Sequence, residues 1–260
     1  MELESIIQSI QKGIGSTLGF LVLILGLGAM LGKLVADSGA AQRITSRLVD
    51  SFGIKNIQWA VVLAGFIVGI PLFYTVGFVI LIPLVFTVAA ATQLPLIYVG
   101  LPMLASLSVT HGFLPPHPAP TAIAGMFDAS IGKTLLYGII VAIPAIIIAG
   151  PLFSRTIKKI KDTHLPEFFN PRVLKDEEMP KMGTSILTAL LPVILKGFST
   201  ILEYLQPMDF TFKTLLVFIG NPVMAMQISV LVANYTLGLA RGKKMTEVMD
   251  SLAGSISSIT

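Results

Sequence analysis

The most constraining feature of this chain is a long stretch without charge. Between Lys55 and Asp128 it runs for 72 residues without one Asp, Glu, Lys or Arg. A water-exposed surface of that length would need charged side chains, so the stretch is typical of segments inside a membrane. Charged residues make up 12% of the whole chain and the mean hydropathy is +0.84, whereas soluble domains have about 25% charged residues. We therefore predict an all-α polytopic membrane protein.

Apolar stretches long enough to cross a bilayer recur along the whole chain. A transmembrane helix needs about 20 largely apolar residues. By that measure the sequence predicts about seven transmembrane segments, at residues 13–34, 57–74, 76–91, 95–110, 134–154, 184–205 and 215–240. They divide the chain into a membrane region at 1–154, a hydrophilic loop at 155–181, and a second membrane region at 182–260 that we expect to be incomplete at its C-terminus.

The basic residues predict how these segments are oriented. The loop at 155–181 opens with Arg155, Lys158, Lys159 and Lys161. Loops rich in Lys and Arg remain on the cytoplasmic side, so we expect this loop to be cytoplasmic. Counting crossings from it gives the other loops: cytoplasmic at 33–55 and 241–244, and external at 128–133 and 203–213.

A proline-rich stretch interrupts the uncharged run, within a broken-helix element at 105–127. Four prolines and a glycine lie between Thr110 and Thr121, and such residues cannot continue a helix. Unpaired backbone in hydrocarbon costs several kcal/mol per group, so it persists only against protein or beside a wet cavity. In transporters such breaks bind the substrate, and the amides of a following helix attract anions. We therefore predict a substrate site here, with a new helix beginning after Pro120.

The predicted substrate-binding residues are the polar or helix-breaking ones at this break, with two more from a second interruption near Pro71. His111 and His117 either are satisfied by carbonyls of the broken backbone, or contact an anionic substrate or carry a proton. Tyr74 and Thr75 either line the site or belong to a kinked helix that satisfies their hydroxyls. The full set is Ser106, Ser108, Thr110, His111, Gly112, His117, Pro118, Thr121, Tyr74 and Thr75.

Other kinds of site find little support in the sequence. Without cysteine there is no disulfide or thiolate chemistry. His111 and His117 are six residues apart, unlike the i, i+4 pair of a zinc helix, and no acid nearby completes a catalytic dyad. We expect no catalytic residue, metal or cofactor, and no nucleic-acid binding, because the net charge of +4 is spread over short loops. An intramembrane enzyme using one of these histidines, or a structural membrane subunit, remains an alternative.

Pairs of glycines four residues apart predict close helix packing. They occur at Gly15 and Gly19, at Gly28 and Gly32, and at Gly65 and Gly69.

The residues around the break resemble a known family. The stretch 108–122, which contains His111-Gly112-Phe113-Leu114-Pro115-Pro116-His117-Pro118, and the stretch 132–138 are similar to the gluconate permease family of the ion transporter superfamily. The resemblance implies a multi-pass permease of the inner (plasma) membrane. Such permeases import gluconate or related sugar acids, generally with protons.

This chain departs from the family pattern at two positions, and the resemblance implies one further expectation about its length. Thr75 stands where the family usually has an acidic residue, and Ala119 where it usually has glycine, so the proton coupling of this chain is left open. Family members are longer at both ends, and transporters of this kind place substrate between two inverted repeats. We therefore expect half of an inverted-repeat transporter, a truncated form that inserts into the bilayer but does not transport by itself. Whether it forms a homo-oligomer is also left open.

Overall fold

A computed structural model describes residues 3–160, 174–204 and 210–257 of the chain. Every regular element within these residues is a helix, which confirms the predicted all-α class. The first part contains α1 (Leu3–Asp37), α2 (Ala40–Phe52), η1 (Ile54–Asn56), α3 (Ile57–Gly69), α4 (Tyr74–Thr92), α5 (Leu96–Phe113), α6 (Pro118–Met126), α7 (Ile131–Ile147), η2 (Ile148–Leu152) and α8 (Phe153–Thr156). The second contains η4 (Asp176–Glu178), α9 (Met182–Tyr204), α10 (Phe210–Ile219), α11 (Pro222–Ala233), η5 (Asn234–Gly238), η6 (Leu239–Arg241) and α12 (Met245–Ser257).

Several of these helices are long and apolar enough to cross a membrane. Four described segments pass by length and composition: Leu96–Met126, Ile131–Thr156, Met182–Leu202 and Pro222–Arg241. A fifth is the pair Val22–Asp37 and Ala40–Phe52, bent by 59°. Shorter apolar helices occupy Ile54–Gly69 and Tyr74–Phe86. The chain is thus a multi-pass integral membrane protein, while the count of seven crossings stays a prediction.

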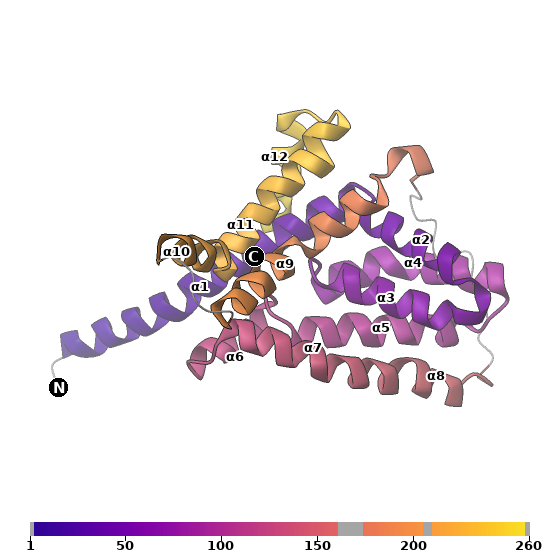
Figure 1. Cartoon of the computed structure of the whole chain (residues 1–260), viewed down its shortest axis with the longest axis horizontal. Helices are drawn as coiled ribbons and strands as arrows, with labels where there is room; N and C mark the ends of the chain where they lie inside the picture. Colours follow the sequence, from indigo (N-terminus) through magenta and orange to yellow (C-terminus); the bar gives the residue numbers. More distant parts are fainter. Residues whose placement is uncertain (1–2, 161–173, 205–209, 258–260) are drawn as a thin grey trace.

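The helices form two groups that are joined through α2 and α9. In Figure 1, α3, α4, α5 and α7 lie roughly parallel on one side, and α7 continues through η2 into α8 along the edge of the molecule. On the other side α1 crosses the molecule beside α9, α11 and α12 (Figure 1). The largest apolar core joins both groups, because residues of α1, α2, α3, α4, α5, α9 and α11 pack together in it.

Helices α3 and α5 approach each other closely. A Cβ atom added at Gly65 would lie 2.6 Å from the backbone oxygen of Met103, and one added at Gly69 would lie 3.0 Å from Leu107 Cδ1. The predicted role of this glycine pair in close packing is therefore confirmed. At Gly15 and Gly19 a Cβ would meet nothing within 4 Å, so that pair has no packing role within the described residues.

Two breaks interrupt the helices at the predicted places, with different boundaries. The first separates α3 from α4 at residues 70–73, and the second separates α5 from α6 at residues 114–117. The second break is shorter than predicted, since α5 continues past Thr110 to Phe113 and α6 begins at Pro118. Leu114 has φ −108° and ψ 120°, as expected for a residue that the next proline keeps out of helical conformation. The Pro115–Pro116 peptide bond is cis.

A polar network joins three segments at one end of the bundle. Arg43 of α2 is buried, and its Nε donates to the carbonyl oxygen of Pro180 over 2.8 Å. Its guanidinium also contacts the carboxylate and the carbonyl of Asp176. Arg241 of η6 donates to the carbonyl oxygen of Glu177 over 3.1 Å. The described end of the predicted 155–181 loop is thus bound to α2 and η6; residues 161–173 of that loop lie outside the described residues, as do residues 205–209 of the predicted external one.

The Gly65 contact makes a prediction about stability. Gly65→Ala should lower the free energy of unfolding by about 1–3 kcal/mol, because the added methyl group meets rigid backbone of α5. The measurement is denaturant unfolding of the purified protein in detergent. Gly15→Ala is the matched control: it gains the same helix propensity but meets no other atom, so it should not lower the value. Equal losses in both variants would contradict close α3–α5 packing.

Candidate functional site

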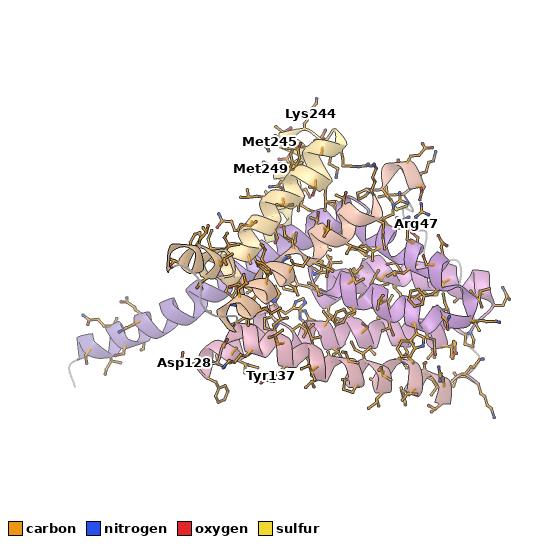
Figure 2. All side chains as sticks on the ribbon, in the orientation of Figure 1. Arg47, Asp128, Tyr137, Lys244, Met245 and Met249 are labelled. Carbon is orange, nitrogen blue, oxygen red and sulfur yellow. The ribbon has the colours of Figure 1, made fainter. Side chains whose placement is uncertain are left out.

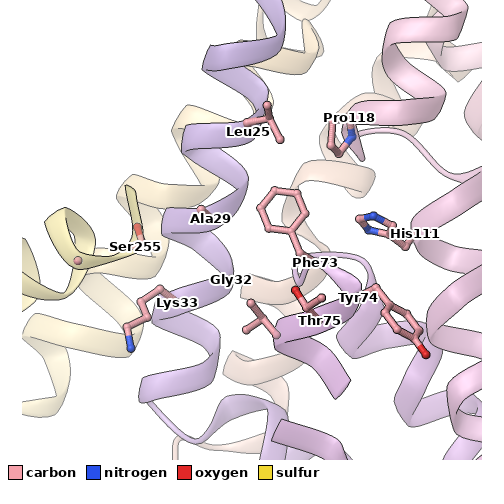
Figure 3. Close-up of a pocket in the computed structure, with 12 residues that line it drawn as sticks. Leu25, Ala29, Gly32, Lys33, Phe73, Tyr74, Thr75, His111, Pro118 and Ser255 are labelled. Carbon is pink, nitrogen blue, oxygen red and sulfur yellow. The ribbon is translucent and has the colours of Figure 1, made fainter. Parts of the chain in front are cut away.

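A cavity of about 580 Å³ lies where α1, the two breaks and α12 meet. Figure 3 shows α1 on one side of it, with Phe73 in the middle and His111 opposite. Its described lining residues are Leu25, Ala29, Gly32, Lys33, Phe73, Tyr74, Thr75, Val76, His111, Pro118, Gly254 and Ser255.

One face of α1 forms the first side of this cavity. Leu25, Ala29, Gly32 and Lys33 recur at helical spacing and so point the same way. A side chain at Gly32 would meet the carbonyl oxygen of Pro71 at 3.1 Å, so glycine there allows α1 to approach the first break. Lys33 is the one formally charged side chain among the described lining residues.

The N-terminus of α4 forms the second side. Phe73 is extended, with φ −60° and ψ 147°, and the helix begins at Tyr74. The first helical hydrogen bond runs from the amide of Gly77 to the carbonyl oxygen of Phe73, over 2.8 Å. The amides of Tyr74, Thr75 and Val76 therefore have no acceptor inside the helix. They carry the partial positive charge of a helix N-terminus, and their three residues line the cavity.

A pair of histidines joins the second break to the first. Nε2 of the buried His117 lies 2.8 Å from the carbonyl oxygen of Gly69, and its Nδ1 lies 3.1 Å from Nδ1 of His111. A carbonyl oxygen can only accept a hydrogen bond, so Nε2 of His117 carries the proton. In a neutral His117 the Nδ1 atom is then an acceptor, and Nδ1 of His111 donates to it. This leaves Nε2 of His111 as an acceptor that the pair does not use.

His111 is the member of the pair that lines the cavity. Its ring meets Phe73 edge-on, with centroids 6.0 Å apart, and that of His117 lies 6.4 Å from Phe73. These contacts limit how the His111 ring can turn.

The predicted site residues separate into three groups. Tyr74, Thr75, His111 and Pro118 line the cavity, and His117 lies behind them. Ser108 and Gly112 are exposed and are not among the lining residues.

The third group consists of buried hydroxyls that bind backbone. Ser106 donates to the carbonyl oxygen of Val62, Thr110 to that of Ser106 and Thr121 to that of His117, at 2.6 to 2.8 Å. Their placement shows these hydroxyls satisfied within the protein, so their predicted contact with substrate stays a prediction.

The start of α6 presents fewer amides than the sequence suggested. Pro118 and Pro120 have no N–H, and the amide of Thr121 donates to the carbonyl oxygen of His117 over 3.1 Å. Of the first four positions, Ala119 alone has an amide that the helix does not use. The helix N-terminus that lines the cavity with three such amides is that of α4.

With this geometry in place, comparison with known proteins identifies the family. A family model described as GntP family permease matches residues 1–260. The chain belongs to the GntP permease family. This confirms the resemblance inferred from the residues around the break. Because the family consists of permeases, the alternative of an intramembrane enzyme is set aside.

Characterised GntP permeases are similar over the whole chain. It is 54% identical over 260 residues to the high-affinity gluconate transporter of Escherichia coli K12, and 51% identical over 269 residues to a gluconate permease of Bacillus subtilis 168. It is 49% identical over 259 residues to the Gnt-II system L-idonate transporter of Escherichia coli K12. These alignments cover 100% of this chain but 59 to 60% of each relative. No solved structure matches the chain.

Several lining residues carry no site prediction from the sequence. Lys33 stands at the end of the predicted span at 13–34, where the predicted cytoplasmic loop begins, and Phe73 lies within the predicted span at 57–74. One signal for Lys33 was available: it follows Leu25, Ala29 and Gly32 on one helical face. Gly254 and Ser255 could not be found this way, since they reach the cavity through packing of α12 against α1.

The cavity combines groups that suit an anion with hydroxyls. Lys33 and the amides of α4 offer positive charge, and Nε2 of His111 offers an acceptor. No carboxylate is among the described lining residues. Within the described part of the chain, no group of three or more His, Asp or Glu side chains could hold a metal ion.

The histidine pair predicts unequal effects of two substitutions. His117→Ala should lower the free energy of unfolding by about 1–3 kcal/mol, because the buried carbonyl of Gly69 loses its donor. His111→Ala leaves that carbonyl its donor but removes the donor to Nδ1 of the buried His117, so it should cost less, about 1 kcal/mol. Denaturant unfolding in detergent measures both. A larger loss for His111→Ala than for His117→Ala would contradict the proposed roles.

Proposed function

We propose that this chain binds gluconate or a related sugar acid and takes part in its import across the inner membrane, coupled to protons. The observation that carries the proposal is the cavity itself, which is lined by Lys33, by the first residues of α4 and by His111. Membership in the permease family and the names of the gluconate and L-idonate transporters support the choice of substrate.

The chemistry of a sugar acid fits this lining. Such a molecule has a carboxylate at one end and hydroxyl groups along the rest of its length. The carboxylate is attracted by the ammonium of Lys33 and by the helix dipole of α4. The hydroxyl groups can donate to Nε2 of His111 and exchange hydrogen bonds with Thr75. A volume of about 580 Å³ is within the usual range for small-molecule pockets.

His111 is the proposed carrier of the coupled proton. The described lining offers no carboxylate for this role, and Thr75, which by the family resemblance stands in place of an acid, is uncharged. Nε2 of His111 can take up one proton from the cavity, and the Nδ1–Nδ1 contact lets His117 share the resulting charge. A proton bound beside an anionic substrate would neutralise the substrate's charge, so that proton and substrate would be transported together.

Contacts between distant segments support the proposed orientation. The contacts of Arg43 with Asp176 and of Arg241 with Glu177 join three segments that we expect on the cytoplasmic side from their basic residues. Lys158 lies 5.1 Å from the centre of the Tyr98 ring, and Gln58 donates to Ser154 Oγ over 2.5 Å. These residues also belong to ends that the count of crossings assigns to the cytoplasmic side.

Uptake by a chimaera tests the transport proposal. Residues 1–260 would replace the matching region of the high-affinity gluconate transporter of Escherichia coli, in cells without other gluconate permeases. We expect accumulation of labelled gluconate that an uncoupler abolishes. His111→Ala in the chimaera should leave downhill uptake but remove accumulation. Accumulation that resists the uncoupler would contradict proton coupling, and absence of uptake by a correctly inserted chimaera would contradict the transport role.

Single cysteines test the orientation, because the chain has none of its own. Asp128 and Lys159 are exposed at opposite ends of the segment that runs from α7 into α8. In intact cells, an impermeant thiol reagent should label Asp128→Cys from outside and reach Lys159→Cys only after permeabilisation. Labelling of both in intact cells would contradict the topology.

A further inference from the structure

We infer that Lys33 binds the carboxylate of the substrate and that Asp37 competes for the same ammonium group. The inference rests on the proposed function and assigns a direction to the bound molecule: its carboxylate lies toward α1 and its hydroxyl groups toward His111. Lys33 lies on α1, outside the sequence motifs at the two breaks.

The position of Lys33 is the first observation. It lies on the α1 side of the cavity, and Figure 3 shows its ammonium on the side of α1 where Ser255 lies, with Phe73 and His111 on the other side. Around it the lining is small, with Ala29 and Gly32 on the same helix. A full positive charge attracts a carboxylate more strongly than the partial charge of a helix N-terminus. The three α4 amides therefore suit the middle of the bound molecule better than its charged end.

The partners of Lys33 are the second observation. Its Nζ lies 3.0 Å from Oδ1 of Asp37, one helical turn later on α1. The side chains are 43% and 35% exposed, and ion pairs with that exposure contribute little to stability. The ammonium can thus turn to another carboxylate at small cost.

The second oxygen of Asp37 is held by α12. Ser251 Oγ donates to Asp37 Oδ2 over 2.8 Å, and the same helix supplies Gly254 and Ser255 to the cavity lining. Asp37 is therefore kept in place beside the cavity by a bond that does not involve Lys33. Its negative charge weakens the attraction of Lys33 for an anion, so the two residues should affect binding in opposite directions.

Equilibrium binding of labelled gluconate to the purified chain in lipid nanodiscs tests this inference. Lys33→Gln should weaken binding roughly tenfold or more, as expected when a charge-assisted hydrogen bond is lost. Lys33→Arg, which keeps the charge, should restore most of the affinity. Asp37→Asn keeps the shape and an oxygen for Ser251 but removes the competing charge, so it should tighten binding.

Two controls separate charge recognition from damage to the fold. Lys12→Gln removes a charge from the exposed start of α1 and should leave the affinity unchanged. Competition by the neutral hexitol, which has the length of gluconate but no carboxylate, should be as strong in Lys33→Gln as in the unaltered protein. If Lys33→Gln weakens the binding of gluconate but not that of the hexitol, Lys33 is the residue that binds the carboxylate.

The outcomes are distinct. Unchanged gluconate affinity in Lys33→Gln would overturn this inference while the proposed function stands, and would leave the carboxylate to the α4 amides. Weaker binding in both Lys33→Gln and Asp37→Asn would also overturn it, because that result indicates a structural role for the ion pair. Absence of gluconate binding to the unaltered protein would overturn the proposed binding function and this inference together.

Discussion

The hydrogen bond from His117 to the carbonyl oxygen of Gly69 is the contact on which the site depends. Gly69 is the last residue of α3, and a carbonyl at a helix end has no partner within its own helix. In the interior of a membrane protein no bulk water replaces that partner. The 2.8 Å bond from Nε2 of His117 supplies it from the other break. Each interruption alone would leave backbone groups without a hydrogen-bond partner. The second break thus supplies the donor that the carbonyl at the first break needs.

This contact also determines the chemistry of the cavity. Nε2 of His117 donates its proton to the carbonyl oxygen of Gly69, so Nδ1 of His117 has no proton. The hydrogen bond between the two Nδ1 atoms therefore places a proton on Nδ1 of His111. The result is that His111 presents its remaining nitrogen as an acceptor. The same arrangement brings the N-terminus of α4 beside His111, since α4 begins five residues after Gly69. Close packing of α3 on α5 through Gly65 and Gly69 holds the two breaks at the same depth.

Much of the fold could be predicted from the sequence, for simple physical reasons. The length of the apolar stretches predicts the helices, and the prolines predict the approximate positions of both breaks. The boundaries were less certain, because Phe113 has no proline directly after it and remains helical, whereas Leu114 does not. Figure 2 shows Asp128 and Lys244 on different edges of the molecule, and the sidedness of their loops stays a prediction.

The site was harder to predict than the fold, because the direction of each polar side chain depends on tertiary contacts. Thr110 and Thr121 donate to carbonyls four residues earlier, a bond that helices offer to any Ser or Thr. Periodicity alone does not say whether such a hydroxyl faces a cavity. Lys33 joins the cavity through the packing of α1 against the first break, which involves residues about forty positions away.

Protection of a single cysteine by substrate tests the central claim most directly. Thr75→Cys introduces a thiol into the cavity of a cysteine-free chain, and Asp128→Cys places one in an exposed turn outside it. The measurement is the rate of modification of each variant in nanodiscs, with and without gluconate. The account predicts that gluconate slows modification at position 75 and leaves the rate at position 128 unchanged. Gluconate that binds yet leaves the rate at position 75 unaltered would contradict the claim that this cavity is the substrate site.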